Sequence, residues 1–433
     1  MKFEPYHEYK DSGVKWVDEI PKNWEAKKLK YIAHISTDKL NKKPDNLPYV
    51  GLEHIESWTG VLTDNQMDKV DSSVNLFHKG DILFGKLRPY LAKVVEAPFD
   101  GVCTSELVVF KVNKDVNSRF VFHQLLSHRF INIVNALTYG VKMPRANPHQ
   151  IENMTIYVPP LGEQEKISLF LDKKTSEIDL TIEKDTRLIE LLKEKRTVLI
   201  NHLVTKGLDP MVKMKDSGVE WIGEIPEDWN ARKLKFFVSK IGSGITPKGG
   251  ASVYVENGIA LLRSQNIHFD GLRLKNVSYI TEETNKTMLN SVVKNKDVLL
   301  NITGASIGRC TYFENQVDRA NVNQHVCIIR PKTIFYRFLN YVLMSNIGQD
   351  QIFSTQMGSS REGVNFEQIG NFVITYPPYE EQEAIANYLD KSTQKIDLTI
   401  QKIQEKINFL EEYKKSLIHH VVTGKVDVGE VAV

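Results

Sequence analysis

The sequence predicts an α+β protein in which two globular domains are joined by two long helices that pack on each other as a coiled coil. Three observations predict this fold class: a sequence block near the start returns in the second half, two long stretches have heptad spacing of apolar residues, and short apolar runs lie between them. The predicted boundaries are a globular domain over 1–158, a helix over 159–210, a second globular domain over 211–376 and a helix over 377–433.

The duplication is specific. Residues 10–31 and 215–236 share 14 identities over 22 positions, including Ser-Gly-Val-x-Trp and Glu-Ile-Pro-x-x-Trp. A second pair of blocks begins at Pro159-Pro160 and at Pro377-Pro378, each followed by Glu-Gln-Glu. We call these paired blocks the repeated frame.

Between the paired blocks lie a first inner segment (31–152) and a second inner segment (236–370), which share little sequence. A repeated frame around divergent inner segments indicates one geometry that serves two different tasks.

Shortly after each Pro-Pro pair begin roughly 40 residues without glycine or proline, from Glu163 to Val204 in the first copy, which predicts a helix about 60 Å long. Spacings of three and four residues are typical of a coiled-coil seam. The first seam is Leu171, Thr175, Ile178, Ile182, Ile189, Leu192, Leu199 and Leu203, and the second is Leu389, Thr393, Ile396, Ile400, Ile403, Ile407, Leu410, Leu417 and Val421. Asp185 and Arg196 interrupt the first seam, and the sequence leaves open whether they set the register or face a partner protein.

The inner segments predict α+β domains. Short apolar runs of strand length occur in both, at 81–84 and 107–110 in the first and at 297–300 and 326–329 in the second. We expect short helices over 120–134 and 335–346.

Composition sets limits on function. Lys and Arg exceed Asp and Glu by only two, so any DNA-facing surface must be a local patch. Three cysteines without metal-like spacing predict reduced thiols in a cytoplasm. The N-terminus lacks the apolar run of a signal peptide, and no run of about 18 apolar residues predicts a membrane span.

Motifs for catalysis and cofactors are weak. Tyr376-Pro377-Pro378-Tyr379 resembles the Asp/Asn-Pro-Pro-Tyr motif of amino-group DNA methyltransferases, but Tyr376 cannot replace the carboxylate or amide that accepts a hydrogen bond from the target amine. The first copy, Val158-Pro159-Pro160-Leu161, favours a structural role for both. Gly242-Ser243-Gly244 is only a fragment of a phosphate-binding loop. We expect no catalytic centre and no bound cofactor.

The histidines at the helix ends and the tryptophans of the repeated frame are interpreted as structural residues. His202, His419 and His420 lie at helix ends without acidic or cysteine neighbours at ligand spacing, which favours solvated or capping histidines over a metal site. Trp16, Trp24, Trp221 and Trp229 could stack on bases, but their place in the repeated frame favours packing.

Candidate DNA contacts lie in loops of both inner segments, where Arg and Lys suit guanine edges and phosphates and Asn and Gln suit adenine. Charged surface loops usually have no such role, but these recur at matching places in both halves. The candidates are Lys86, Arg88, Tyr90, Lys93, Lys142, Arg145 and Asn147 in the first inner segment, and Arg263, Gln265, Asn266, Asn301, Thr303, Arg309, Gln324, Ser359, Ser360, Arg361 and Asn365 in the second.

The repeated frame resembles a known family. Ser-Gly-Val-x-Trp-(Val/Ile)-x-Glu-Ile-Pro-x-x-Trp at 12–24 and 217–229, with Pro-Pro-x-x-Glu-Gln-Glu-x-Ile at 159–167 and 377–385, is similar to the repeats of DNA-specificity subunits in type I restriction-modification systems. The run from Phe84 to Leu91 looks like a recurrent variant of the first target-recognition domain. The resemblance covers nearly the whole chain.

This resemblance implies two target-recognition domains joined by antiparallel helices, each domain reading one half of a bipartite double-stranded DNA target while the helices set the spacer. It implies two methyltransferase subunits that bring S-adenosylmethionine, and restriction subunits that add ATP and Mg²⁺ dependence, with no cofactor on this chain. A coiled-coil adaptor that binds only proteins is the alternative, although it has no need of matching Arg/Asn-rich loops. A fused methyltransferase lacks its cofactor motif.

Overall fold

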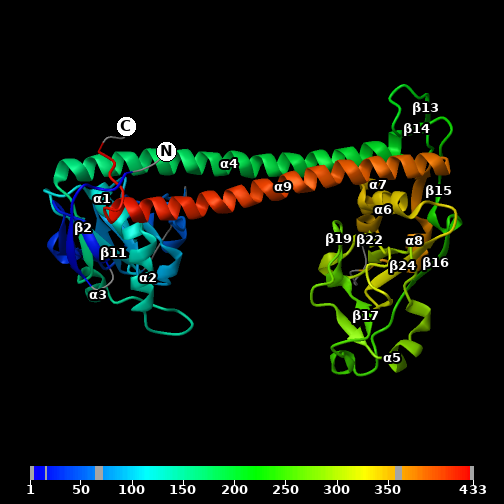
Figure 1. Ribbon diagram of the computed structural model, residues 1–433, viewed down its shortest axis with the longest axis horizontal. Coiled ribbons are helices and arrows are strands. Elements are labelled where there is room, and N and C mark those ends of the chain that lie inside the picture. Colours follow the sequence, from blue (N-terminus) through cyan, green and yellow to red (C-terminus); the bar gives the residue numbers. More distant parts are fainter. Residues whose placement is uncertain (1–3, 15–16, 64–71, 356–362, 430–433) are drawn as a thin grey trace. The chain divides into compact units, whose positions relative to one another are not determined.

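The computed structural model describes residues 4–14, 17–63, 72–355 and 363–429. The chain divides into two compact units: unit 1 is Met1–Thr186 with Gln404–Val433, and unit 2 is Arg187–Ile403. Each unit holds one globular part together with segments of both long helices (Figure 1).

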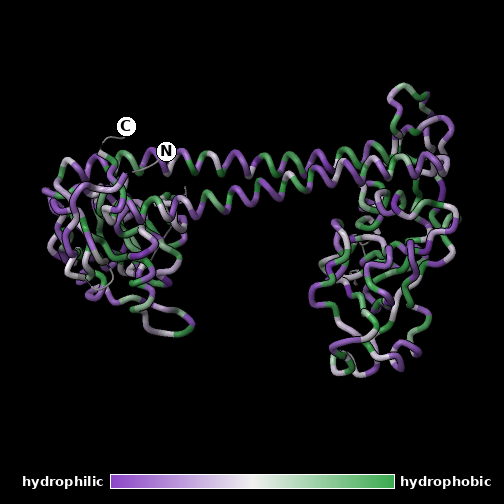
Figure 2. Tube along the Cα trace, viewed as in Figure 1, coloured by the Kyte–Doolittle hydropathy of each residue, from purple (hydrophilic) through white to green (hydrophobic). Residues whose placement is uncertain are grey.

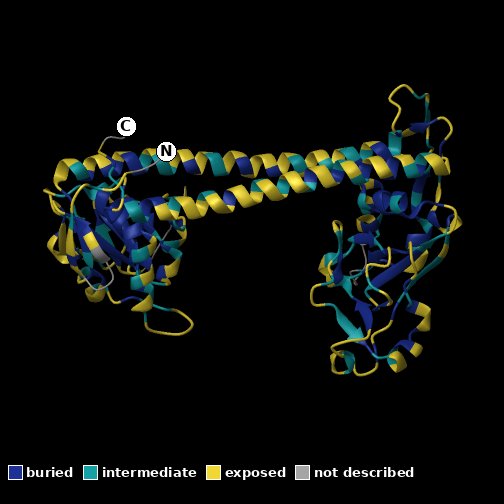
Figure 3. Cartoon of the chain, viewed as in Figure 1, coloured by how far each residue is buried: buried dark blue, intermediate teal, exposed yellow. Residues whose placement is uncertain are grey.

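The two long helices are α4 (Leu161–Lys206) and α9 (Tyr379–Val422). All predicted seam positions are buried or half-buried, and Figure 3 shows buried residues recurring along otherwise exposed helices. In unit 1 the beginning of α4 and the end of α9 belong to one hydrophobic core, and in unit 2 the end of α4 shares a core with the beginning of α9. The helices are therefore antiparallel in each unit, and the predicted coiled coil is confirmed.

The two polar residues that interrupt the first seam are paired within the chain. In unit 1, Lys406 Nζ lies 2.8 Å from Asp185 Oδ2, and in unit 2, Arg196 Nε lies 3.3 Å from Asp397 Oδ1. Because both charges face α9, the structure supports the register alternative.

Unit 1 contains twelve described strands and three short α-helices besides its share of α4 and α9. The strands are β1 (Tyr9–Val14), β2 (Val17–Pro21), β3 (Glu25–Lys28), β4 (Ala33–Ile35), β5 (Lys39–Leu40), β6 (Tyr49–Val50), β7 (Val74–Phe77), β8 (Ile82–Gly85), β9 (Val94–Glu96), β10 (Gly101–Thr104), β11 (Leu107–Val112) and β12 (Thr155–Val158). The helices are α1 (Ser118–Leu126), α2 (His128–Ala136) and α3 (Pro148–Glu152), with 3-10 turns η1 (Leu29–Tyr31), η2 (Leu52–His54) and η3 (Pro89–Leu91).

Unit 2 repeats this plan. Its strands are β13 (Met214–Asp216), β14 (Glu224–Pro226), β15 (Asn230–Lys233), β16 (Val238–Ser243), β17 (Ile259–Leu262), β18 (Ile267–His268), β19 (Gly271–Leu272), β20 (Ser278–Ile280), β21 (Val298–Asn301), β22 (Cys310–Tyr312), β23 (Ala320–Val322), β24 (Val326–Pro331) and β25 (Val373–Tyr376). Its helices are α5 (Glu282–Lys286), α6 (Tyr336–Met344), α7 (Asn346–Ser354) and α8 (Phe366–Asn371), with 3-10 turns η4 (Leu234–Phe236), η5 (Gly250–Val253), η6 (Ser264–Asn266), η7 (Leu289–Ser291) and η8 (Gly304–Ser306).

The inner segments share one antiparallel sheet despite their different sequences. Its strand order is β4-β11-β8-β9 in unit 1 and β16-β24-β21-β22 in unit 2. All four residues of β8 and of β21 are buried, because each sheet is covered by core on both faces. This explains why these strands are continuous apolar runs rather than alternating ones. Figure 2 shows hydrophobic residues, in green, within both globular parts and along the long helices. The second sheets differ: β5-β7-β10-β6 against β20-β17-β23.

The predicted short helices needed correction. The single helix expected over 120–134 is two helices, because Ser127 leaves helical geometry at φ −59° and ψ 139° and caps α2 through its hydroxyl. The helix expected over 335–346 runs from Tyr336 to Met344, and Ser345, with extended backbone at φ −73° and ψ 169°, separates it from α7.

The repeated frame fastens the start of each long helix to its globular part through a buried glutamine. In unit 1 the Asn117 N–H donates to Gln164 Oε1 at 2.9 Å, and Gln164 Nε2 donates to the Pro159 carbonyl at 2.8 Å. Because Asn117 caps α1, this side chain ties together the Pro-Pro segment, α1 and α4.

Unit 2 has the same arrangement. The Phe335 N–H donates to Gln382 Oε1 at 2.7 Å, and Gln382 Nε2 donates to the Pro377 carbonyl at 2.8 Å. This gives the Pro-Pro pairs the structural role that the sequence predicts.

The neighbouring glutamate holds a buried tryptophan. Trp24 Nε1 donates to Glu163, and Trp229 Nε1 donates to Glu381, both at 2.9 Å. Both indoles are fully buried, so the packing prediction is confirmed for them. We call each set of glutamine, glutamate and tryptophan the helix clamp.

The other frame tryptophans differ. Trp221 is 57% exposed, so the packing prediction is wrong there, and Trp16 lies outside the described residues. The three cysteines are free and buried. Within the described parts of the chain, no helix is long and apolar enough to cross a bilayer, and no group of three or more His, Cys, Asp or Glu could hold a metal ion.

Replacing Gln382 by alanine should lower the free energy of unfolding of unit 2 by about 2–3 kcal/mol, because the Phe335 N–H and the Pro377 carbonyl lose their partner in a buried site. Gln394→Ala, at an exposed position of the same helix, is the matched control and should change it little. Urea unfolding of both variants measures the difference. Equal losses of unfolding free energy would show that the hydrogen bonds of Gln382 do not stabilise unit 2.

Candidate nucleic-acid interface

In unit 1 the two predicted basic loops meet. The segment after β8 pairs with the segment before α3, since the Ala146 N–H donates to the Lys86 carbonyl at 2.9 Å and the Arg88 N–H donates to the Pro144 carbonyl at 2.7 Å. Loops that are more than 50 residues apart in sequence thus form one surface at the end of the shared sheet.

Side chains on this surface differ in solvent exposure and in their hydrogen-bond partners. Arg88 is exposed and sits in the left-handed region at φ 49°, and Tyr90 is 46% exposed. Lys142 is also exposed. Lys93, in contrast, donates to the Leu52 and Ile55 carbonyls, both at 2.7 Å, and therefore stabilises a loop.

A carboxylate orients one of the predicted arginines. Arg145 forms a bidentate pair with Glu106, with Nε–Oε2 at 3.0 Å and Nη2–Oε1 at 2.8 Å, while its side chain stays 41% exposed. Asn147 is exposed and its side chain accepts the His149 N–H as the cap of α3.

Unit 2 has the equivalent joint. The Val364 N–H donates to the Ile302 carbonyl at 3.0 Å, and the Ile302 N–H donates to the His325 carbonyl at 3.0 Å. The latter bond matches the one from the Lys86 N–H to the Glu106 carbonyl. The inner segments therefore present the same backbone joint with different side chains.

Polar side chains link the second surface. Thr303 Oγ1 and Gln324 Nε2 bond the two ring nitrogens of His325, and Thr246 Oγ1 donates to Gln324 Oε1 at 2.6 Å. Gly244 allows this assembly, since a Cβ there would lie 1.6 Å from the Val322 carbonyl oxygen. The glycine fragment noted in the sequence thus serves close backbone packing.

Two predicted contacts have interior roles. Asn301 is fully buried and donates to the Ser264 carbonyl at 2.9 Å and to Ser306 Oγ at 3.1 Å. Asn266 is 1% exposed and accepts the Arg263 N–H at 3.0 Å. The side chains of Asn301 and Asn266 therefore position the loops. Direct contact with DNA remains a prediction for their exposed neighbours.

The remaining predicted residues of unit 2 surround this surface. Gln265 is exposed, and Arg263 and Arg309 are half-buried, with Arg263 over the Tyr254 ring at 5.4 Å. Asn365 is exposed and caps α8, as Asn147 caps α3. Ser359, Ser360 and Arg361 lie outside the described residues.

Sequence reasoning missed Glu106, and it noted His325 only as part of the run Asn323-Gln324-His325, without including it among the candidate contacts. Each stands immediately before the apolar run of β11 or β24, and each bonds a predicted residue. Aligning the two apolar runs would have placed them at equivalent positions.

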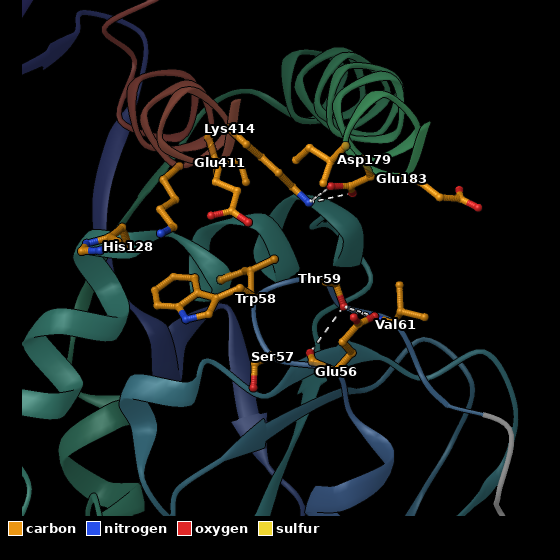
Figure 4. Close-up of a pocket in the computed structure, with 14 residues that line it drawn as sticks. Glu56, Ser57, Trp58, Thr59, Val61, His128, Asp179, Glu183, Glu411 and Lys414 are labelled. Atoms are coloured by element: carbon orange, nitrogen blue, oxygen red, sulfur yellow. Dashed lines mark hydrogen bonds and ion pairs between the residues drawn. The ribbon is translucent and has the colours of Figure 1, made fainter. Parts of the chain in front are cut away.

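Unit 1 also has a cavity of about 670 Å³ between its globular part and the long helices (Figure 4). Trp58 lines it and stacks on His128 with ring centroids 5.3 Å apart. The lining includes two lysines, Lys414 and Lys415, and four carboxylates, Glu56, Asp179, Glu183 and Glu411. The excess of carboxylates disfavours a phosphate backbone, and the lining includes none of the predicted DNA contacts.

The comparisons with known proteins agree with the duplicated architecture. The family model described as "Type I restriction modification DNA specificity domain" matches residues 21–192 and again 226–408. The chain belongs to this family. The two matched ranges, the specificity domains, each include one inner segment and most of the long helix that follows.

Relatives support the assignment of the chain as a type I specificity subunit. It is 27% identical to the type I restriction enzyme MjaVIII specificity subunit of Methanocaldococcus jannaschii, over 97% of both chains. It is 32% identical to the EcoDI specificity subunit of Escherichia coli over 34% of each chain.

Solved structures support the fold. One, described as "Structural basis underlying complex assembly and conformational transition of the type I R-M system", has a TM-score of 0.74 at 18% identity and covers 94% of this chain and 99% of its own. The HsdS subunit from Thermoanaerobacter tengcongensis has a TM-score of 0.55 at 18% identity, with 94% and 98% covered.

The Arg145–Glu106 pair makes a specific prediction. Arg145→Ala should weaken recognition of one part of the DNA target by about 1–3 kcal/mol, the worth of a lost bidentate contact. Glu106→Gln should weaken the same recognition by a smaller amount. If Glu106 acts only by orienting the guanidinium, Glu106→Gln should cause no further loss of binding in the Arg145→Ala variant. Competition binding with base-substituted duplexes gives the double-mutant cycle, and additive losses would show that Glu106 acts independently.

Proposed function

We propose that this specificity subunit reads a bipartite double-stranded DNA target, with the first inner segment specifying one half-site and the second inner segment the other. The observation that carries the proposal is the equivalent backbone joint in the two units, which presents different side chains in each. The same backbone arrangement with different loop side chains in each unit would allow the two units to recognise different base sequences.

The loop chemistry supports duplex DNA as the ligand. Arg88 and Lys142 are exposed cations on the first surface, and Gln324 and Asn365 are exposed amides on the second. Guanidinium and amide groups are the usual readers of guanine and adenine edges in the major groove. An adaptor that binds only proteins needs no such pairing of loops.

We further propose that the chain has no catalytic centre and holds two methyltransferase subunits, with S-adenosylmethionine bound by them, and restriction subunits that use ATP and Mg²⁺. The duplicated frame supports two copies of a partner, since its sequence recurs in each half of the chain with 14 identities over 22 positions. The expected location is the cytoplasm, where such a complex meets DNA.

A matched pair of substitutions tests the proposal. Arg88→Ala should relax one half-site and Arg309→Ala the other, each by about 1–3 kcal/mol if the arginine makes a bidentate base contact. Co-expression with the neighbouring methyltransferase genes, followed by genome-wide mapping of methylated adenines, reads both half-sites at once.

Three outcomes count against parts of the proposal. If either substitution relaxed both half-sites equally, that arginine would be a general phosphate anchor or a support. If both changed the same half-site, the assignment of one inner segment to each half would be wrong. A complex that methylates without sequence preference would favour the adaptor alternative.

A further inference from the structure

The repeated frame carries an exposed aromatic ring among cations, once in each unit. We call these the basic corners: Lys28, Lys30 and Tyr31 in unit 1, and Lys233, Lys235 and Phe236 in unit 2. The rings are 66% and 61% exposed. Lys30 Nζ lies 5.4 Å from the centroid of Tyr31, and Lys235 Nζ lies 5.7 Å from that of Phe236.

The backbone of the two corners is nearly the same. Lys28 has φ −69° and ψ 140°, and Lys233 has φ −66° and ψ 137°. The following leucines, Leu29 and Leu234, each donate an N–H at 2.8 Å to the segment that precedes β12 or β25. The duplication thus extends from sequence to geometry.

Packing accounts for the leucines but not for the rings. Leu29 and Leu234 are fully buried in the cores of their units, whereas Tyr31 and Phe236 point outward. An exposed ring of this size has an unfavourable contact with water, and a nearby cation is attracted to its face. Interior structure therefore gives no reason for the same aromatic and basic pattern at both places.

Each corner borders the candidate DNA surface of its own unit. The turn η1 packs against α3, which begins directly after Asn147, and η4 packs against α8, which begins directly after Asn365.

The side chains that lie over the two rings are cations. Glu25 is paired with Lys27, which leaves Lys28 and Lys30 as the cations beside Tyr31. In unit 2, Arg232 replaces Lys27 and adds a second cation over the ring of Phe236, at 5.8 Å.

We propose that the two basic corners bind the phosphodiester backbone of duplex DNA on either side of the target, without reading its sequence. The proposal rests on the proposed DNA-reading function. Two half-sites of different sequence have the same phosphodiester backbone. A pattern that is present in both halves of the frame is therefore suited to bind that backbone. Lysine serves as a point charge for phosphate, while base reading is left to the inner segments.

Charge removal in the assembled complex tests this. Lys28→Gln/Lys30→Gln, and separately Lys233→Gln/Lys235→Gln, should lower affinity by the same factor for a target duplex and for a scrambled duplex of equal length. The slope of log affinity against log salt should become less steep by about 0.9 for each lost phosphate contact, so by about 1.8 for a pair. The methylated sequence should not change.

Two controls separate the explanations. Lys193→Gln/Lys195→Gln removes the same charge from exposed positions on α4 and should leave the slope unchanged. Lys28→Arg/Lys30→Arg keeps the charge and should keep the affinity. Thermal unfolding of each variant checks that the fold is intact.

Failure of this proposal is distinguishable from failure of the proposed function. If the glutamine variants bind both duplexes with unchanged affinity and slope, the corners do not contact phosphate, although target reading by the wild-type complex still stands. If they lose the methyltransferase subunits instead, the corners are protein contacts and the proposal is overturned. A wild-type complex without target preference would refute the proposed function itself.

Discussion

The buried amide of Gln164, repeated as Gln382, joins three parts of each unit that are distant in sequence. It accepts a backbone N–H from the start of α1 or α6 and donates to the carbonyl of a Pro-Pro pair, at the first turn of a long helix. Loss of one of these partners leaves a buried polar group unpaired, which costs about 1–3 kcal/mol, more than the net contribution of the bond when it is made. The orientation of each inner segment on its helix therefore depends on this residue, with Trp24 or Trp229 packed beside it.

A fixed attachment leaves the inner segments free to diverge. Both keep the same antiparallel sheet and the same joint between the loop after β8 or β21 and the segment before α3 or α8. The side chains at that joint are unlike: an Arg–Glu pair in unit 1, and a Thr–His–Gln network in unit 2. The frame and clamps thus hold the fold, while the loop side chains differ between the units. This agrees with the family model of a DNA specificity domain, which matches the chain twice.

The sequence predicted features that depend on local periodicity. Both long helices and the four strand-length apolar runs were found, because heptad spacing and runs buried on both faces are visible in the chain itself. The break at Ser127 was missed, since apolar spacing continues across it. Predictions at the loops were less complete: the carboxylate that holds Arg145 comes from Glu106, 39 residues earlier, and the burial of Asn301 follows from β21 being covered on both faces. Such partners are set by tertiary packing, which no local pattern encodes.

We propose that the helix clamps attach the inner segments to a helix pair whose length sets the spacer between the two half-sites. Inserting seven residues into α4 after Leu192 adds a whole heptad, so the seam stays in phase, and lengthens the helix by about 10 Å. Since DNA advances about 3.4 Å per base pair, mapping methylated adenines for this variant should show unchanged half-sites, a spacer longer by one to three base pairs, and weaker binding because the domains must also rotate about the DNA. An active variant that kept its original spacer would contradict the account.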